Sequence, residues 1–128
     1  DQEVLIGELI KAIKMIDETV AVTLCGNAGY GPNYPWEAVV QTILDAAVVE
    51  KGKCPIDYYY AMTYYNPIEQ EQQWALGWRD MLQTRYNCPT QTLGVGVDFF
   101  DAHAYDPHTF AQWAVDNDMS VAVWATNP

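Results

Sequence analysis

Basic residues and long apolar stretches are both scarce in this chain of 128 residues. Six Lys and Arg stand against 17 Asp and Glu, which gives a formal net charge of −11. Because phosphate groups repel such a chain, we expect neither nucleic acid nor an anionic membrane as a partner. No uninterrupted apolar run approaches the roughly 20 residues that cross a bilayer. Neutral and cationic ligands remain as candidates.

Cysteine and histidine are also few, with three Cys and two His. No CxxC motif and no Cys/His pair at metal-binding spacing occurs, so the sequence predicts no zinc site, and no cofactor is expected. Cys54 and Cys88 each precede a proline and a predicted strand. If those strands are neighbours, both cysteines lie at one end of the sheet. We then expect either a Cys54–Cys88 disulfide or two buried thiols.

Helical and strand patterns alternate four times along the chain. An amphipathic helix is predicted over residues 3–17, where apolar residues recur at helical spacing: Leu5, Leu9, Ala12, Ile13 and Ile16. Further helices are predicted over 35–49, with Lys51-Gly52-Lys53 closing it, and over 68–85 and 107–117. Strands are predicted over 19–24, 56–65, 92–99 and 120–125, from their β-branched, aromatic and apolar residues.

This alternation predicts an α/β fold with a parallel sheet and crossover helices. Four such units are half of a (β/α)₈ TIM barrel, which needs about 250 residues. An open doubly wound sheet is the alternative, but the loop Cys25–Gly29 does not match the GxGxxG phosphate motif. We therefore interpret residues 1–128 as a single half-barrel domain.

The strand that begins at Ile56 is rich in tyrosine and ends in a Tyr-Tyr-Asn-Pro loop. Its segment Ala61–Pro67 (Ala-Met-Thr-Tyr-Tyr-Asn-Pro) resembles the sixth-strand motif of glycoside hydrolase family 18, the chitinases and endo-β-N-acetylglucosaminidases, and is nearest to the hevamine-like branch. Leu93–Val97 resembles the seventh strand of these barrels, and Ser120–Trp124 is similar to the eighth. The resemblance covers the chain as the C-terminal half of the barrel, from helix four through strand eight.

The resemblance implies a substrate and roles for named residues. The substrate would be a β-1,4-linked N-acetylglucosamine oligosaccharide, whose own 2-acetamido oxygen attacks the anomeric carbon in a retaining hydrolysis. Tyr64 would be catalytic, because it would hydrogen-bond the acetamido group. Trp124 would form the floor beneath the sugar and Met62 would pack beside it. Residues at the same strand ends complete the predicted substrate-binding set: Tyr65, Asn66 and Asp98. For Asp98, a solvated loop acid is the competing interpretation.

One departure from the family limits the functional prediction. The chain contains no complete Asp-x-x-Asp-x-Asp-x-Glu motif, which supplies the family's catalytic acid. Asp1 and Glu3 are either its last fragment or favourable acids at a helix N-terminus. The chain would therefore be an enzyme only when completed by an N-terminal half that carries the acid. The alternatives are a chitinase-like lectin or storage protein that binds the sugar without hydrolysis, and an α/β interaction protein without sugar chemistry.

A half-barrel also predicts a partner and a location. Its open strand edges and uncovered core wall favour pairing, so we expect another polypeptide or a second copy to complete the barrel. For the same reason we expect that the chain is not stable as a lone monomer. The family resemblance and the Cys54–Cys88 disulfide would both place the protein outside the cell, as a secreted protein.

Overall fold

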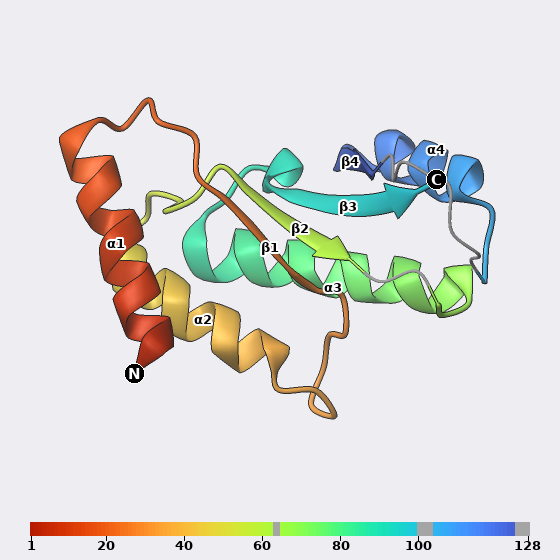
Figure 1. The fold of residues 1–128 in the computed structure, drawn as a ribbon, viewed down its shortest axis with the longest axis horizontal. Helices are drawn as coiled ribbons and strands as arrows, with labels where there is room; N and C mark the ends of the chain where they lie inside the picture. The colour runs from red at the N-terminus through yellow and green to blue at the C-terminus, as the bar shows by residue number, and fades with distance from the viewer. Residues whose placement is uncertain (63–64, 100–103, 125–128) are drawn as a thin grey trace.

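The computed structural model describes residues 1–62, 65–99 and 104–124. Helices and strands alternate through this part of the chain (Figure 1). In chain order the elements are α1 (Gln2–Ile16), β1 (Thr23–Asn27), α2 (Trp36–Ala47), β2 (Tyr58–Met62), α3 (Ile68–Tyr86), the short 3-10 helix η1 (Thr90–Thr92), β3 (Leu93–Asp98), α4 (Pro107–Asp116) and β4 (Ser120–Trp124).

The strands form one parallel sheet in the order β1-β2-β3-β4. Each strand therefore lies beside the next strand along the chain, and the helix between them crosses over to restore the same direction. This confirms the predicted α/β class and the predicted parallel sheet. A sequential parallel sheet of this kind is compatible with half of a barrel.

The hydrophobic core lies between one face of the sheet and the helices. Tyr59 on β2 is in register with Leu93 on β3, and both side chains are buried. They belong to the same cluster of buried residues as Trp78 of α3 and Phe110 of α4. Figure 1 shows α3 running behind β1 and β2, which accounts for the burial of this face. The alternate residues of the strands point to the other face, because side chains alternate along a strand.

The predicted strand over 19–24 begins too early. Residues 17–20 instead form a turn at the end of α1, in which the Asp17 carboxylate accepts hydrogen bonds from the backbone N–H and hydroxyl of Thr19. The Lys14 ammonium also donates to the Val20 carbonyl. The first contact with the segment that enters β2 is at Val22, whose carbonyl accepts from the N–H groups of Asp57 and Tyr58, and strand pairing begins with Thr23 and Tyr58. The strand therefore starts where pairing becomes available and not where β-branched residues begin.

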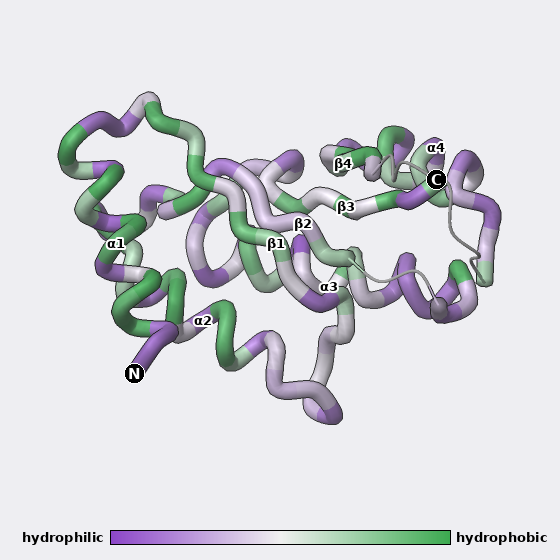
Figure 2. Tube along the Cα trace, in the orientation of Figure 1, coloured by the Kyte–Doolittle hydropathy of each residue, from purple (hydrophilic) through white to green (hydrophobic). Residues whose placement is uncertain are grey.

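The first helix exists as predicted, but its packing face is different. Leu5, Leu9 and Ile16 are 63%, 61% and 86% exposed, whereas Gly7 and Ile10 are buried. Gly7 faces the backbone of α2 so closely that an added Cβ would overlap it. The side of α1 that contacts α2 is thus roughly opposite to Leu5 and Leu9. Figure 2 shows the hydrophobic residues that recur along α1.

The ends of two other helices differ in how well they match the sequence prediction. α2 ends at Ala47, because Val48 adopts extended backbone, so Lys51-Gly52-Lys53 does not close it. Gly52, with φ of +87°, lies in the turn that follows. α4 begins at Pro107, as predicted, and Asp106 accepts a hydrogen bond from the His108 N–H there.

Candidate functional site at the carboxyl edge of the sheet

The last residues of the four strands form the candidate site, and three of these four residues belong to the predicted set. Because parallel strands share one carboxyl edge, Asn27, Met62, Asp98 and Trp124 lie along it in that order. Asn27 is in register with Met62, and Asp98 is in register with Trp124. The structure therefore brings together three of the predicted site residues: Met62, Asp98 and Trp124.

Met62 and Trp124 touch although their strands are not neighbours. The indole Nε1 of Trp124 lies 3.2 Å from the Met62 sulfur, which is a weak hydrogen-bond acceptor. The contact passes over Gly96 on β3: an added Cβ there would lie 2.6 Å from Met62 Cγ and 3.3 Å from Trp124 Nε1. Gly96 thus leaves the space in which the two side chains meet.

A similar arrangement occurs two residues earlier on β3, at Gly94. The ring of Tyr60 covers Gly94, its register partner, in the space that a side chain would occupy. Tyr60 also stacks on Tyr58, with ring centroids 5.7 Å apart. We call the sheet face that carries these side chains the aromatic face; it comprises Tyr58, Tyr60, Met62, Gly94, Gly96 and Trp124.

The pKa values of three tyrosines, Tyr60, Tyr59 and Tyr30, are raised by their surroundings. Burial, together with the nearby Tyr58 and Cys25, raises the pKa of Tyr60 above its usual value. Burial raises the pKa of Tyr59 in the same direction. For Tyr30, burial and the neighbouring Glu37 raise the pKa to about 12. These phenols are therefore neutral groups that can donate hydrogen bonds, and none is poised to act as a base.

A rigid network holds the loop that follows β1. The Tyr59 hydroxyl donates to the Asn27 carbonyl at 3.0 Å, and the Trp78 indole N–H donates to the Ala28 carbonyl at 2.9 Å. The Asn27 side chain accepts from the Gly29 N–H at 2.8 Å. The first two bonds connect β2 and α3 to the same loop, and the third forms within the loop. Asn27 therefore acts as a turn-forming residue here, through its side-chain oxygen.

Beyond β2, the predicted residues Tyr65 and Asn66 differ in their surroundings. Tyr65 is largely exposed, whereas the Asn66 amide donates to Glu71 Oε1 at 3.2 Å. Glu71 lies in the first turn of α3 and is only 2% exposed. The sequence patterns did not single out this residue. The sequence shows Glu71 as an acid just after the loop that follows the strand, but nothing there distinguishes it from the other acids of a very acidic chain.

Asp98 is buried, so its interpretation as a solvated loop acid is wrong. Its exposed fraction is 4%, because β3 lies between β2 and β4 and Asp98 is the last residue of that central strand. Among the described residues the buried acids are Glu71 and Asp98. Glu71 follows β2 and Asp98 ends β3, so both lie toward the carboxyl edge.

Tyr64, the predicted catalytic residue, lies outside the described residues. Its role therefore stays a prediction.

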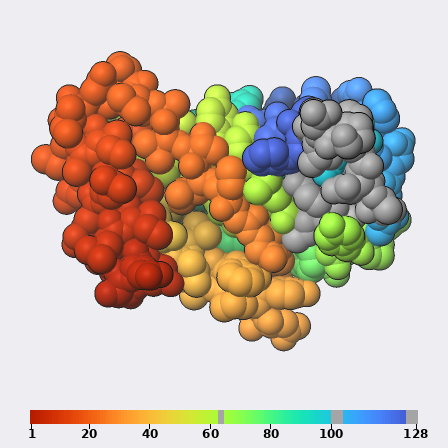
Figure 3. All heavy atoms as spheres, in the orientation of Figure 1, coloured from red at the N-terminus to blue at the C-terminus, as the bar shows by residue number. Residues whose placement is uncertain are grey.

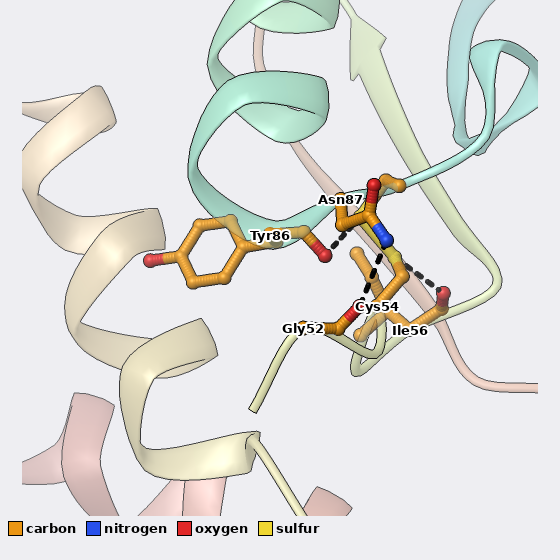
Figure 4. The surroundings of a disulfide bond; sticks show 6 residues. Gly52, Cys54, Ile56, Tyr86 and Asn87 are labelled. Carbon is orange, nitrogen blue, oxygen red and sulfur yellow. Dashed lines mark hydrogen bonds between the residues drawn. A yellow bond between two sulfur atoms is a disulfide. The ribbon is translucent and has the colours of Figure 1, made fainter. Parts of the chain in front are cut away.

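The opposite edge of the sheet carries the predicted disulfide. Cys54 and Cys88 are bonded to each other, with Cα atoms 4.8 Å apart, ahead of β2 and β3 respectively (Figure 4). Nearby, the Asn87 side chain donates to the Gly52 carbonyl at 2.9 Å. The segments that lead into β2 and β3 are therefore joined covalently, which decides between the disulfide and the two buried thiols.

A cavity of about 260 Å³ also lies at this amino edge, lined by residues that include Lys14, Cys54 and Asp57. Lys14 Nζ is 2.7 Å from Asp57 Oδ2, and the same carboxylate accepts from the Val22 N–H. Burial by itself raises the pKa of Asp57, but the bonds from Lys14 and Val22 outweigh it and lower the pKa. The charged groups here tie α1 to the start of β2, so we assign the cavity a structural role.

No protein-family model, curated protein or solved structure matches this chain. The resemblance to glycoside hydrolase family 18 therefore rests on the three strand motifs themselves. Within residues 1–62, 65–99 and 104–124, no group of three or more His, Cys, Asp or Glu side chains is placed to hold a metal ion. In that same part of the chain, no helix is long and apolar enough to cross a membrane.

Proposed function

We propose that this chain supplies the substrate-holding side of a chitinase-type sugar site. In this proposal residues 1–128 are the C-terminal half of a (β/α)₈ barrel, and the ligand is a β-1,4-linked N-acetylglucosamine oligosaccharide. The observation that carries the proposal is the contact between Trp124 and Met62 over Gly96, at the carboxyl edge of a parallel sheet. Barrel enzymes bind their substrates at this edge.

The aromatic face has the chemistry that a neutral sugar requires. Trp124 is 44% exposed, so its ring is available to stack against a pyranose face while Met62 holds its edge. Tyr60, with its raised pKa, stays neutral and adds a hydroxyl without adding charge. Asp98 ends β3 in register with Trp124, so the two side chains leave the same face of the sheet.

In the proposed reaction the oxygen of the substrate's 2-acetamido group attacks the anomeric carbon. The bond from that carbon to the leaving oxygen breaks, and an acid protonates the leaving oxygen. Water then opens the cyclic intermediate with retention of configuration. Tyr64 would hydrogen-bond the acetamido group during the attack. The acid would come from the polypeptide that completes the barrel, because this chain lacks the family's acidic motif.

Binding without hydrolysis is the second candidate function, and one observation favours it. The Asp1 carboxylate accepts a hydrogen bond from the Glu3 N–H at 3.0 Å and so caps α1. Asp1 therefore caps the helix through its carboxylate and Glu3 lies in its first turn, as acids at a helix N-terminus commonly do. With Asp1 and Glu3 in this role, the chain would act as a lectin unless a partner brings the catalytic acid.

Secretion forms part of the same proposal. The Cys54–Cys88 disulfide is compatible with an oxidising compartment, where chitin-type substrates would be met.

The test titrates the full chain with N-acetylglucosamine tetramer while following tryptophan fluorescence and the release of reducing ends. We expect a saturable fluorescence change that Trp124→Phe abolishes and Trp113→Phe retains, since Trp113 lies on α4 and stacks on Phe110. Reducing ends should appear only after addition of a polypeptide that carries the acidic motif, and Tyr64→Phe should then lower turnover more than binding.

Three results would contradict the proposal. A folded wild-type chain that shows no fluorescence response to the sugar would remove its basis. A response that Trp124→Phe retains would place the sugar elsewhere. Release of reducing ends by the chain alone would contradict the assignment of the acid to a partner.

A further inference from the structure

The two outer edges of the sheet expose apolar side chains that a core would normally cover. At the first edge, α1 packs on α2 through Gly7 and Ile10, while Leu5, Leu9 and Ile16 form an exposed stripe on its other side. We call these three residues the α1 stripe. An amphipathic helix that turns its large apolar residues outward marks an interaction surface.

At the second edge, β4 lacks the cover that its neighbour has. Val97 of β3 is fully buried, but its register partner Val123 is 61% exposed. Val115 on α4 is also exposed. The sequence of β4 is apolar along almost its whole length, as in strands buried on both faces, so its composition fits an interior position and not an edge.

The strand edges are open at the same two places. In the described part of the sheet, β1 pairs only with β2 and β4 pairs only with β3. Residues of β1 are exposed or half-buried throughout, whereas every residue of β3 is buried. An open parallel edge of this kind offers unpaired backbone groups to another strand. Figure 3 shows α1 at one end of the molecule and β4, in dark blue, beyond its middle, so α1 does not cover β4 within one copy.

The two edges are complementary to each other. In this fold α2, α3 and α4 each precede a strand that extends the sheet by one place. By the same rule, α1 belongs over the sheet position beyond β1, where no strand of the described chain lies. A strand placed there with the composition of β4 would bring Val123 beneath the α1 stripe. One edge thus has an apolar helix without a strand, and the other an apolar strand without a helix.

We propose that two copies of this chain join edge to edge, with β1 of each copy parallel to β4 of the other. The α1 stripe of each copy covers Val123 and Val115 of its partner, and the same contact forms twice about a two-fold axis. Four strands from each copy then close one sheet of eight. This inference rests on the barrel architecture of the proposed function, but it does not depend on the sugar chemistry.

The net charge of the chain opposes this association, so the stability of the dimer should depend on salt in a characteristic direction. Each copy has a formal net charge of −11, so two copies repel each other at long range. The proposed contact itself consists of Leu, Ile and Val side chains. Added salt should therefore strengthen the dimer, because it screens the repulsion and leaves the hydrophobic contact intact. An interface made of ion pairs would respond in the opposite way.

The dimer also has a consequence for function. Neither copy has the family's acidic motif, so the pair would bind the sugar without cleaving it. A polypeptide that carries the motif would have to occupy the same two edges, and would therefore compete with the second copy.

Sedimentation equilibrium of the full chain tests this inference at low and high sodium chloride. We expect a dimer whose dissociation constant falls as salt rises. Leu9→Glu and Val123→Glu should each raise that constant at least about tenfold, because a buried unpaired carboxylate is costly. Both positions are 61% exposed in one copy, so neither change disturbs the fold. Val49→Glu, at a similarly exposed position outside both edges, is the matched control and should leave the constant unchanged.

Mixing the two variants separates this geometry from others. In a dimer of one Leu9→Glu copy and one Val123→Glu copy, both substitutions fall in the same contact. The other contact then has Leu9 and Val123 unchanged. The mixture should therefore form dimers more readily than either variant alone. A wild-type monomer at all salt concentrations would overturn the inference. Val123→Glu that dimerises normally while Leu9→Glu does not would also overturn it, since that result indicates contact between two α1 helices. A dimer that shows no response to sugar would reject the proposed function alone.

Discussion

Gly96 illustrates how one missing side chain organises its neighbours. Side chains on β2 and β4 are separated by a whole strand, and they meet only because β3 offers no Cβ between them. The glycines at 94 and 96 alternate with buried valines, so one face of β3 is packed and the other receives side chains from neighbouring strands. The shape of the site therefore depends on the absent side chain at Gly96 as much as on Met62 and Trp124.

We predict that Gly96→Ala destabilises the protein and weakens the proposed sugar site. The new Cβ would lie 2.6 Å from Met62 Cγ, so Met62 must move and its contact with Trp124 is disturbed. Overpacking of this kind costs about 1–3 kcal/mol of unfolding free energy. Urea denaturation measures that loss, and titration with N-acetylglucosamine tetramer measures the change in affinity.

Gly77→Ala is the control for this prediction. Its added Cβ would overlap the ring of Tyr30 and so overpacks α3 without touching the aromatic face. It should destabilise the fold while Trp124 fluorescence still responds to sugar. Equal loss of sugar affinity in both variants would show that general instability, and not the Met62–Trp124 contact, explains the effect.

Individual residues of the site were predictable to different degrees. Met62 and Trp124 could be named from the strand motifs, because both motifs include the carboxyl end of a strand. The burial of Glu71 and Asp98 could not be predicted, since most acids in so acidic a chain are solvated. Their burial depends on which strand lies in the middle of the sheet and where α3 begins.

At the scale of elements, periodicity predicts that α1 is a helix, whereas packing determines which side of α1 is buried. Helical spacing correctly predicted the helix, but it could not choose between two sides that both carry apolar residues. The choice follows from Gly7, which lets α1 approach the backbone of α2 more closely than a larger residue would. Ile10 is buried against α2 as a result, and Leu5 and Leu9 remain exposed.

The disulfide is the strongest constraint between elements, and we predict its contribution to stability. Cys54 and Cys88 are 34 residues apart, and closing such a loop reduces the entropy of the unfolded chain by the equivalent of about 4 kcal/mol in the simplest model. We expect the Cys54→Ala/Cys88→Ala double variant to lose about 2–4 kcal/mol of unfolding free energy in urea.

Cys25→Ala provides the matched control, because Cys25 is exposed and forms no disulfide. Its unfolding free energy should stay close to that of the wild type. A double variant as stable as Cys25→Ala would mean that the hydrogen bond between Asn87 and Gly52 already holds together the segments that precede β2 and β3.

At the scale of the whole molecule, the dominant features are the negative charge and the open sheet. The described structure contains three ion pairs, and in two of them both side chains are about half exposed or more. Exposed pairs contribute little to stability, so these ion pairs offset little of the repulsion that a formal net charge of −11 creates. The fold is therefore held by its core and disulfide against its own charge.

We predict that sodium chloride stabilises the protein at neutral pH. Raising the salt from about 0.1 M to about 1 M shortens the screening length from about 10 Å to about 3 Å, which weakens the repulsion. The thermal midpoint should rise by a few degrees at constant protein concentration, equivalent to about 1 kcal/mol for a domain of this size. Calorimetry at pH 4, where many carboxylates are protonated, should show a smaller rise. A lower midpoint in salt would indicate that attractive ion pairs dominate.

The sequence by itself determined the α/β class, the parallel sheet, the candidate disulfide partners and the rim positions of Met62 and Trp124. These follow from local patterns: apolar periodicity, Cys-Pro spacing and the ends of strands. Only the tertiary structure decided the start of β1, the outward side of α1, the burial of Asp98 and Glu71 and the role of Gly96. Each of these depends on which elements become neighbours, and hydrophobic periodicity records that a side chain prefers burial without recording which surface will cover it.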